Sequence, residues 1–214
     1  NLIQSMIAAS ERVFEFLEQE EYIDEGTKDC SKVKGNIEFK HVQFGYDKNK
    51  LIIKDFNAKV NSGEKIAIVG PTGAGKTTMV KLLMRFYELN GGEILLDGVN
   101  IKDYKREYYE TVFAMVLQDT WLFNGTILDN LRYGNLNASD KEVIDAAKTA
   151  SADFFIRTLP DGYNSIINEE TNNISGGEKQ LLTIARAILA NPKVLILDEA
   201  TTNVDTRTEE LIQQ

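Results

Sequence analysis

The sequence predicts an α/β fold organised around a phosphate-binding loop, and three observations support this prediction. A uniformly apolar run at 66–69, a glycine loop and an apolar helical pattern follow one another, as strand, loop and helix do in a buried parallel sheet. Residues 37–60 alternate with period two, which is typical of antiparallel strands. Residues 126–190 are mainly helical in pattern. The 214 residues suffice for one substantial core with attached subdomains.

The N-terminal stretch predicts an amphipathic helix over residues 1 to about 21, with Leu2, Ile7 and Phe14 among its apolar positions. Its glutamate-rich end continues into the polar, aperiodic residues 20–29, which we interpret as a linker. The chain starts at Asn1 rather than at methionine, so we expect that a segment precedes it.

Two antiparallel strands are predicted on either side of the turn-like residues 47–50. Tyr46 lies at this turn, where an aromatic ring has at least even odds of serving only in hairpin packing. His41, the only histidine of the chain, falls on the first strand, and we interpret it as structural.

The glycine loop fits the pattern G-x-x-x-x-G-K-[ST] and reads Gly70-Pro71-Thr72-Gly73-Ala74-Gly75-Lys76-Thr77-Thr78. Its glycines can adopt left-handed dihedral angles that direct backbone N–H groups at phosphate oxygens. The helix that begins near Lys76 adds the positive end of its dipole, about half an elementary charge. Lys76 would reach the β- and γ-phosphates, and the Thr77 hydroxyl would bind Mg²⁺. The flanking strand and helix disfavour the alternative of a chance glycine turn.

Two further strands follow the first helix. Residues 93–98 read as a strand that ends in a turn, and the apolar run 112–117 ends at Gln118. Open α/β sheets place ligand contacts just past such strand ends, so Gln118 is a candidate site residue.

The run Ser175-Gly176-Gly177-Glu178 opens a strong helical pattern. Ser175 is a credible N-cap, and Glu178 completes a capping box three residues later. Capping explains the serine and the glutamate, but it does not explain two consecutive glycines.

The apolar strand 194–197 ends in Asp198 and Glu199. Such an acidic pair is by itself as often structural as functional. Together with a glycine loop it forms the usual second half of a nucleotide site, in which the first carboxylate holds the metal and the second handles water.

The composition is that of an ordinary globular protein, with 43% hydrophobic and 27% charged residues. No apolar run approaches the length of a membrane span. The single cysteine, Cys30, excludes an internal disulfide. The net charge of −9 argues against broad nucleic-acid binding, which needs clustered Lys and Arg.

These motifs, in this order, resemble the nucleotide-binding domain of ATP-binding cassette (ABC) transporters, most closely the exporter branch. The resemblance covers residues 36–214 and implies a P-loop NTPase core with a parallel sheet, an antiparallel β subdomain and an α-helical subdomain near 120–180. The N-terminal part, residues 1–35, resembles the cytoplasmic end of the last transmembrane helix of exporters plus a linker.

The resemblance implies a complete set of nucleotide contacts. Tyr46 would stack on adenine beside Ile52. The loop would bind the phosphates through Gly70, Thr72, Gly73, Ala74, Gly75, Lys76, Thr77 and Thr78. Mg²⁺ would be held by Thr77, Gln118 and, mainly through water, Asp198, and Gln118 would also sense the γ-phosphate. Glu199 resembles the general base, which makes Glu199, Gln118 and Lys76 the implied catalytic residues.

The resemblance also implies partners. Ser175, Gly176, Gly177 and Glu178 match the family signature, which binds the γ-phosphate of ATP held by a second ABC ATPase domain, and Asp205 matches a loop that crosses the dimer interface. Two copies would enclose two ATP molecules and power export through a transmembrane domain of the same chain, at the cytoplasmic face of the membrane. No nucleic acid is implied.

Three departures qualify the resemblance. The signature usually ends in Gln, whereas here it ends in Glu178, whose charge could weaken the closed dimer. Residues 168–173 are Asn-rich and lack the usual Gly-Glu-Arg-Gly pattern. The family has a histidine after the Asp205 loop, whereas this sequence stops at Gln214. We therefore expect the chain to bind ATP better than it hydrolyses it.

Two alternatives stay open. A soluble ABC ATPase acting on chromosomes would carry a long coiled coil between Gln118 and Ser175, and the interval is too short for one. The N-terminal helix and the acidic balance disfavour a ribosome-associated type. A degenerate, regulatory nucleotide-binding subunit is the second alternative, and the presence of Glu199 argues against it.

Overall fold

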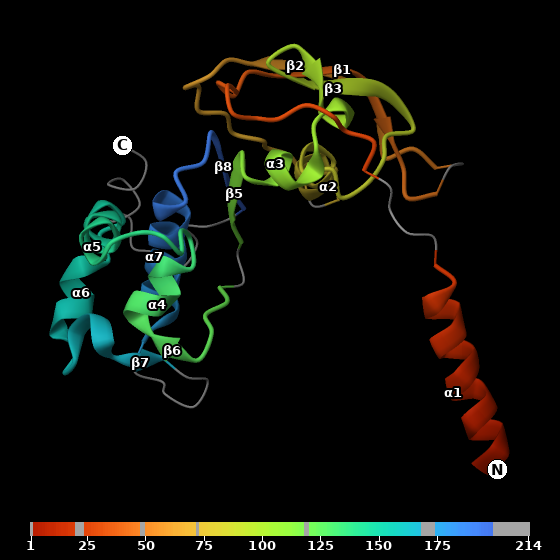
Figure 1. Ribbon diagram of the computed structural model, residues 1–214. Helices are drawn as coiled ribbons and strands as arrows, with labels where there is room; N and C mark the ends of the chain where they lie inside the picture. Colours follow the sequence, from red (N-terminus) through yellow and green to blue (C-terminus); the bar gives the residue numbers. More distant parts are fainter. Residues whose placement is uncertain are drawn as a thin grey trace.

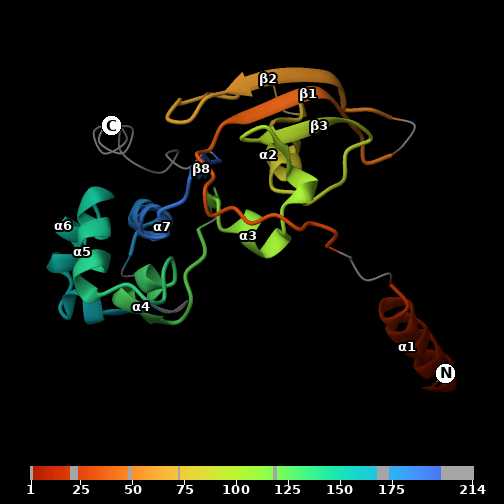
Figure 2. The same cartoon turned by 45° about the horizontal axis from the view of Figure 1, so that its top comes forward.

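The computed structural model describes residues 2–19, 24–47, 50–71, 73–117, 120–167 and 174–198. The first element, α1 (Leu2–Leu17), is the predicted N-terminal helix and stands apart from the rest of the molecule in both ribbon views (Figures 1 and 2). Its apolar side chains, among them Ile3, Phe14 and Phe16, are exposed. Within the described ranges, no helix combines the length and the apolar character needed to span a bilayer.

The predicted antiparallel strands form a four-stranded sheet in the order β2-β1-β3-β4. Its strands are β1 (Ile37–Phe44), β2 (Ile53–Val60), β3 (Gly91–Leu96) and β4 (Val99–Asn100). Ile37 lies opposite Val60 on one neighbour and Leu96 on the other, so β1 is the central strand of this part. After β3, the chain turns through Asp97 and Gly98, which have φ angles of 50° and 79°.

Helices α2 (Lys76–Leu83) and α3 (Arg106–Glu110) lie beneath this sheet (Figure 1), and the 3₁₀ turn η1 (Ile101–Asp103) connects β4 toward α3. Leu82 of α2 and Ile94 of β3 are fully buried in the shared core. Each such side chain contributes about 1.5–3 kcal/mol through burial. This packing fixes the helix that starts at the glycine loop against the antiparallel sheet.

The strand predicted at 66–69 is absent from the described structure. Residues 64–70 have no regular structure, and Ile66, Ile68 and Val69 are 57%, 53% and 86% exposed. An apolar run becomes a strand only when a neighbouring strand accepts its backbone hydrogen bonds, and no strand in the described ranges pairs with it. The prediction of this strand from apolarity alone was therefore wrong for this structure.

The parallel sheet is formed by β5 (Phe113–Val116) and β8 (Val194–Leu197), two of the predicted strands. Their register pairs Phe113 with Val194 and Val116 with Leu197. Both strands consequently end at the same edge of the sheet, with Leu117 and Asp198 immediately beyond.

The helical subdomain encloses a second core. It consists of β6 (Gly125–Thr126), α4 (Ile127–Arg132), α5 (Asp140–Thr149), α6 (Asp153–Thr158), η2 (Gly162–Asn164), β7 (Ile166–Ile167) and α7 (Gly176–Leu189), with β6 and β7 paired antiparallel. Buried Ile127, Ile156 and Leu182 belong to it. The buried Asn130 accepts hydrogen bonds from Phe123 N and from the Arg186 guanidinium, which ties the segment before α4 to α7.

Candidate functional site

The glycine loop leads directly into α2, as the sequence predicts. Gly75, the N-cap of α2, has a φ of 91°, and Gly73 has a φ of 82°. Both angles lie in the left-handed region that side chains with a Cβ rarely adopt. Gly70 lies in a tight place instead, because a Cβ there would be 3.3 Å from the Cβ of Ala74. The loop therefore has two left-handed positions and one crowded position.

The start of α2 lacks the usual internal partners of a helix N-terminus. No side chain caps it, and its first turn contains no acidic residue. The four leading N–H groups of a helix need partners, and together with the helix dipole they favour an anion. This end of α2 is accordingly suited to a phosphate group.

Lys76 brings a positive charge to the same place. Its Nζ donates hydrogen bonds to the carbonyl oxygens of Gly70, at 2.7 Å, and Pro71, at 3.3 Å. Thr77 is exposed beside it, whereas Thr78 is buried. Thr72, also predicted to bind phosphate, lies outside the described residues.

An aromatic cluster adjoins this helix. The Tyr46 hydroxyl lies 3.2 Å from Thr78 Oγ1, and its ring packs edge to face against Phe44, at 5.1 Å, and Tyr87, at 5.2 Å. Edge-to-face contacts hold the ring from its sides. Tyr46 nevertheless remains 56% exposed, so part of its surface is available to a ligand. No local pattern in the sequence predicts the contacts with Thr78 and Tyr87.

Ile52 lies next to the loop as well. A Cβ at Gly75 would be 3.4 Å from Ile52 Cγ2, which puts the two residues in contact range. A hollow of about 410 Å³ extends alongside, lined by residues of β2, the segment before the loop and α2, including Ile52, Gly75, Lys76 and Met79. The structure thus brings the predicted adenine side, Tyr46 and Ile52, to the predicted phosphate loop.

Of the predicted metal and water residues, the structure describes Asp198 at the end of the parallel sheet and Thr77 in α2. The Asp198 N–H donates to the carbonyl of Val116, the last residue of β5, at 3.0 Å. Asp198 therefore lies beside the end of the strand that Gln118 follows in the sequence. Gln118 and Glu199 lie outside the described residues, as does Asp205. The shared role of Thr77, Asp198 and Gln118 in holding Mg²⁺ stays a prediction.

The predicted capping box at the start of α7 is confirmed. Glu178 Oε2 accepts hydrogen bonds from Ser175 N at 2.7 Å and from Ser175 Oγ at 2.8 Å, and Ser175 Oγ accepts from Glu178 N at 3.3 Å. Gly176 is exposed, and a Cβ there would meet no atom within 4 Å. Neither capping nor crowding requires a glycine at Gly176.

Comparison with known proteins agrees with this arrangement. The family model described as ABC transporter matches residues 53–202, more than half of the chain. The chain belongs to the ABC transporter family. Its fold is the α/β fold of the ABC ATPase, as predicted from the sequence. Membership of this family implies ATP binding and, in general, ATPase activity.

Individual ABC transporters are similar over the full chain. A fatty acid ABC transporter ATP-binding/permease protein of Mycobacterium bovis is 50% identical over 214 residues, which cover 100% of this chain and 34% of that protein. The uncharacterized ABC transporter ATP-binding protein YfiC of Bacillus subtilis is 52% identical, with coverages of 100% and 36%. The chain spans about a third of the length of these relatives.

A solved structure shows the same fold. The structure of a bacterial Atm1-family ABC exporter with ATP bound superposes with a TM-score of 0.83 and 39% sequence identity, covering 98% of this chain and 37% of that chain. The predicted resemblance to the exporter branch of ABC transporters is therefore confirmed.

Proposed function

We propose that this chain is the ATP-binding and ATP-hydrolysing domain of an ABC exporter, which drives transport by ATP-dependent pairing with a second ABC ATPase domain. The observation that carries the proposal is the uncapped start of α2, where Gly73 and Gly75 are left-handed and Lys76 supplies positive charge. The name of one relative, ATP-binding/permease protein, supports a transmembrane domain in the same polypeptide. As part of the same proposal, the ATPase domain lies at the cytoplasmic face of the membrane.

ATP would lie across α2. Its triphosphate would accept hydrogen bonds from the N–H groups of the loop and from Lys76, whose Nζ would leave the Gly70 and Pro71 carbonyls. Its adenine would stack on the exposed part of Tyr46 next to Ile52. The contact of Tyr46 with Thr78 and the nearness of Ile52 to Gly75 support this arrangement.

Mg²⁺ fits the donors that the chain offers. This ion is usually held by one or two protein oxygens together with phosphate oxygens and water. The Thr77 hydroxyl and the Asp198 carboxylate would be such donors, with Gln118 completing the set. Within the described ranges, no group of three or more Asp, Glu, His or Cys side chains could hold a metal ion. Bound Mg²⁺ would neutralise charge on the β- and γ-phosphates.

Hydrolysis would depend on Glu199, which would accept a proton from the attacking water. Ser175, Gly176 and Gly177 of one copy would face the γ-phosphate held by the other copy, and Asp205 would lie at the interface between them. In this arrangement the two sites are complete only in the dimer, so ATP binding would favour pairing and hydrolysis would favour separation.

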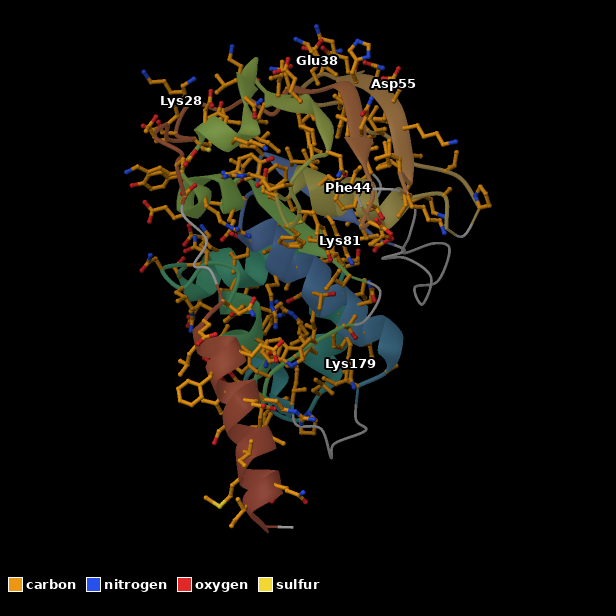
Figure 3. All side chains as sticks on the ribbon, turned by 90° about the vertical axis from the view of Figure 1, so that its right-hand side faces the viewer. Lys28, Glu38, Phe44, Asp55, Lys81 and Lys179 are labelled. Atoms are coloured by element: carbon orange, nitrogen blue, oxygen red, sulfur yellow. The ribbon has the colours of Figure 1, made fainter. Side chains whose placement is uncertain are left out.

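Lys76→Ala tests the proposal. Removing the loop's side-chain charge should lower ATP affinity at least a hundredfold while leaving the fold intact, as measured by calorimetry with Mg-ATP. The matched control is Lys81→Ala, which removes the lysine in the last turn of α2 (labelled in Figure 3) and should change the affinity less than twofold. Equal affinities for the parent and Lys76→Ala would exclude the loop as the phosphate site.

A further inference from the structure

The segment between α1 and β1 is attached to the ATPase body over residues 24–28, which we call the strap. Lys28 N and Thr27 N both donate to the Asp103 carbonyl at 2.9 Å, and Lys105 N donates to the Lys28 carbonyl at 2.9 Å. These bonds join the strap to η1 and to the start of α3. In Figure 2, the chain after α1 passes α3 before it turns into β1.

Gly26 shows how closely the strap approaches the body. It is buried, and a Cβ added to it would overlap the carbonyl group of Tyr104. A glycine is required here by contact with another backbone, because no side chain fits between the two segments. The strap is therefore seated in a defined place.

Asp24 connects the strap to two helices. Its Oδ2 accepts a hydrogen bond from Arg106 N, at the start of α3, at 2.6 Å. Its Oδ1 lies 3.5 Å from Nη2 of Arg85, the second residue after α2. The hydrogen bond from Arg106 N lowers the pKa of the Asp24 carboxyl below its usual value, so Asp24 is ionised at neutral pH.

Arg85 is buried and firmly held. Only 4% of its side chain is exposed, its Nη1 donates to the Tyr104 carbonyl at 2.8 Å, and its guanidinium lies 5.7 Å from the centre of the Tyr109 ring. Its φ of 58° is left-handed, where a residue other than glycine carries a cost that surrounding contacts must offset. The buried Arg85 charge depends on Asp24, whose own side chain is 30% exposed, because removing that carboxylate would leave the guanidinium uncompensated.

We propose that the strap, through Asp24 and Arg85, is coupled to the far end of the nucleotide-loop helix α2, so that strap seating and ATP binding favour one another. Helix α2 has only eight residues, about 12 Å in length, with Lys76 at one end and the Arg85 contact just past the other. A short helix packed in a core moves as a unit, so restraint at one end restrains the other. The inference rests on the proposed function, because it assumes that ATP binds at Lys76.

Amide hydrogen exchange of the unaltered chain, with and without saturating Mg-ATP, tests the proposal without any substitution. We expect ATP to slow exchange both in the loop at 70–78 and in the strap at 24–28, since coupling between two sites is reciprocal. Protection of the loop with unchanged strap exchange would overturn the coupling and leave the proposed function intact. Protection of neither segment would overturn both.

A double-mutant cycle then isolates the Asp24–Arg85 contact. Asp24→Asn should weaken ATP binding about fivefold or more, and Arg85→Met should abolish any further effect of Asp24→Asn. The matched control is Lys28→Met, which breaks the exposed Lys28–Asp103 ion pair of the same strap and should change ATP affinity less than twofold. An Asp24→Asn effect equal to that of Lys28→Met, or unchanged in the Arg85→Met background, would overturn the coupling. If Arg85→Met fails to fold, the exchange experiment still decides.

Discussion

Helix α2 begins after Gly75, which is left-handed and has no side-chain cap, whereas α7 begins after Ser175, whose hydroxyl and the Glu178 carboxylate close a capping box. Each helix start presents unpaired N–H groups and the positive end of a dipole. At α2 these groups are left for an anion from outside. At α7 the chain already supplies an anion of its own. The difference teaches that an uncapped helix start leaves its amides to a phosphate alone, whereas at a capped start an approaching phosphate also meets the chain's own carboxylate.

The largest effect is expected when a charge is added at the start of α7 in a variant that hydrolyses ATP slowly. Glu199→Gln should lower ATP turnover about 10²- to 10⁴-fold, because the amide cannot accept a proton from water. The ATP-bound dimer should then accumulate in sedimentation experiments. Adding Gly176→Glu, which places a charge at the exposed start of α7, should prevent that accumulation. Turnover at the parent rate would show that Glu199 is not the base and would favour a regulatory subunit.

A smaller effect is expected from the aromatic ring beside α2. Tyr46→Ala should weaken ATP by about 1–3 kcal/mol, by analogy with base stacking on aromatic side chains, and should barely affect inorganic triphosphate. Tyr133→Ala, which removes an exposed tyrosine that packs on Arg186 of the helical subdomain, is the matched control and should leave both affinities unchanged. Calorimetry with the two ligands measures the difference. Equal losses for ATP and triphosphate would reduce Tyr46 to a packing residue.

The backbone difference between the helix starts is tested by a pair of glycine substitutions. Gly75→Ala forces a side chain into left-handed backbone and should lower the free energy of unfolding by about 1–2 kcal/mol. Gly176→Ala enters open space and should leave it within about 0.5 kcal/mol of the parent. Denaturant titration compares the two variants. Equal stabilities would mean that the loop relaxes to a different conformation.

The smallest effect is expected from the Glu178 carboxylate, which caps the start of α7. Glu178→Gln keeps an oxygen that can accept the Ser175 hydrogen bonds but removes the charge, so stability should fall by only about 0.3–1 kcal/mol. If a partner's phosphate approaches this helix start, the same variant should pair at a severalfold lower ATP concentration. An unchanged ATP dependence of pairing would place Glu178 away from the partner's nucleotide.

Much of the fold is readable from local patterns. The alternation in β1 and β2, the apolar strands β5 and β8 and the capping box of α7 each depend on residues close in sequence, and the structure contains all of them. The strand predicted at residues 66–69 is absent, because an apolar run does not show whether a neighbouring strand is there to pair with it. Pairing is a long-range property that no short window contains.

The candidate site divides in the same way. The left-handed Gly73 and Gly75 follow from the loop pattern, since only glycine adopts such angles easily. The Tyr46 contact with Thr78 joins residues 32 positions apart, and it arises only because β1 packs over α2. The role of Arg85 could not be predicted from the sequence, because it depends on a contact with the carboxylate of Asp24, 61 positions earlier.

The contact of Asp24 with the buried Arg85 has a practical consequence for protein engineering. A shortened protein that starts at β1 would lack Asp24, and the guanidinium of Arg85 would lose its carboxylate although every nucleotide-binding motif remained. Truncated or fused proteins intended to keep ATPase activity should therefore include residue 24 and the residues after it.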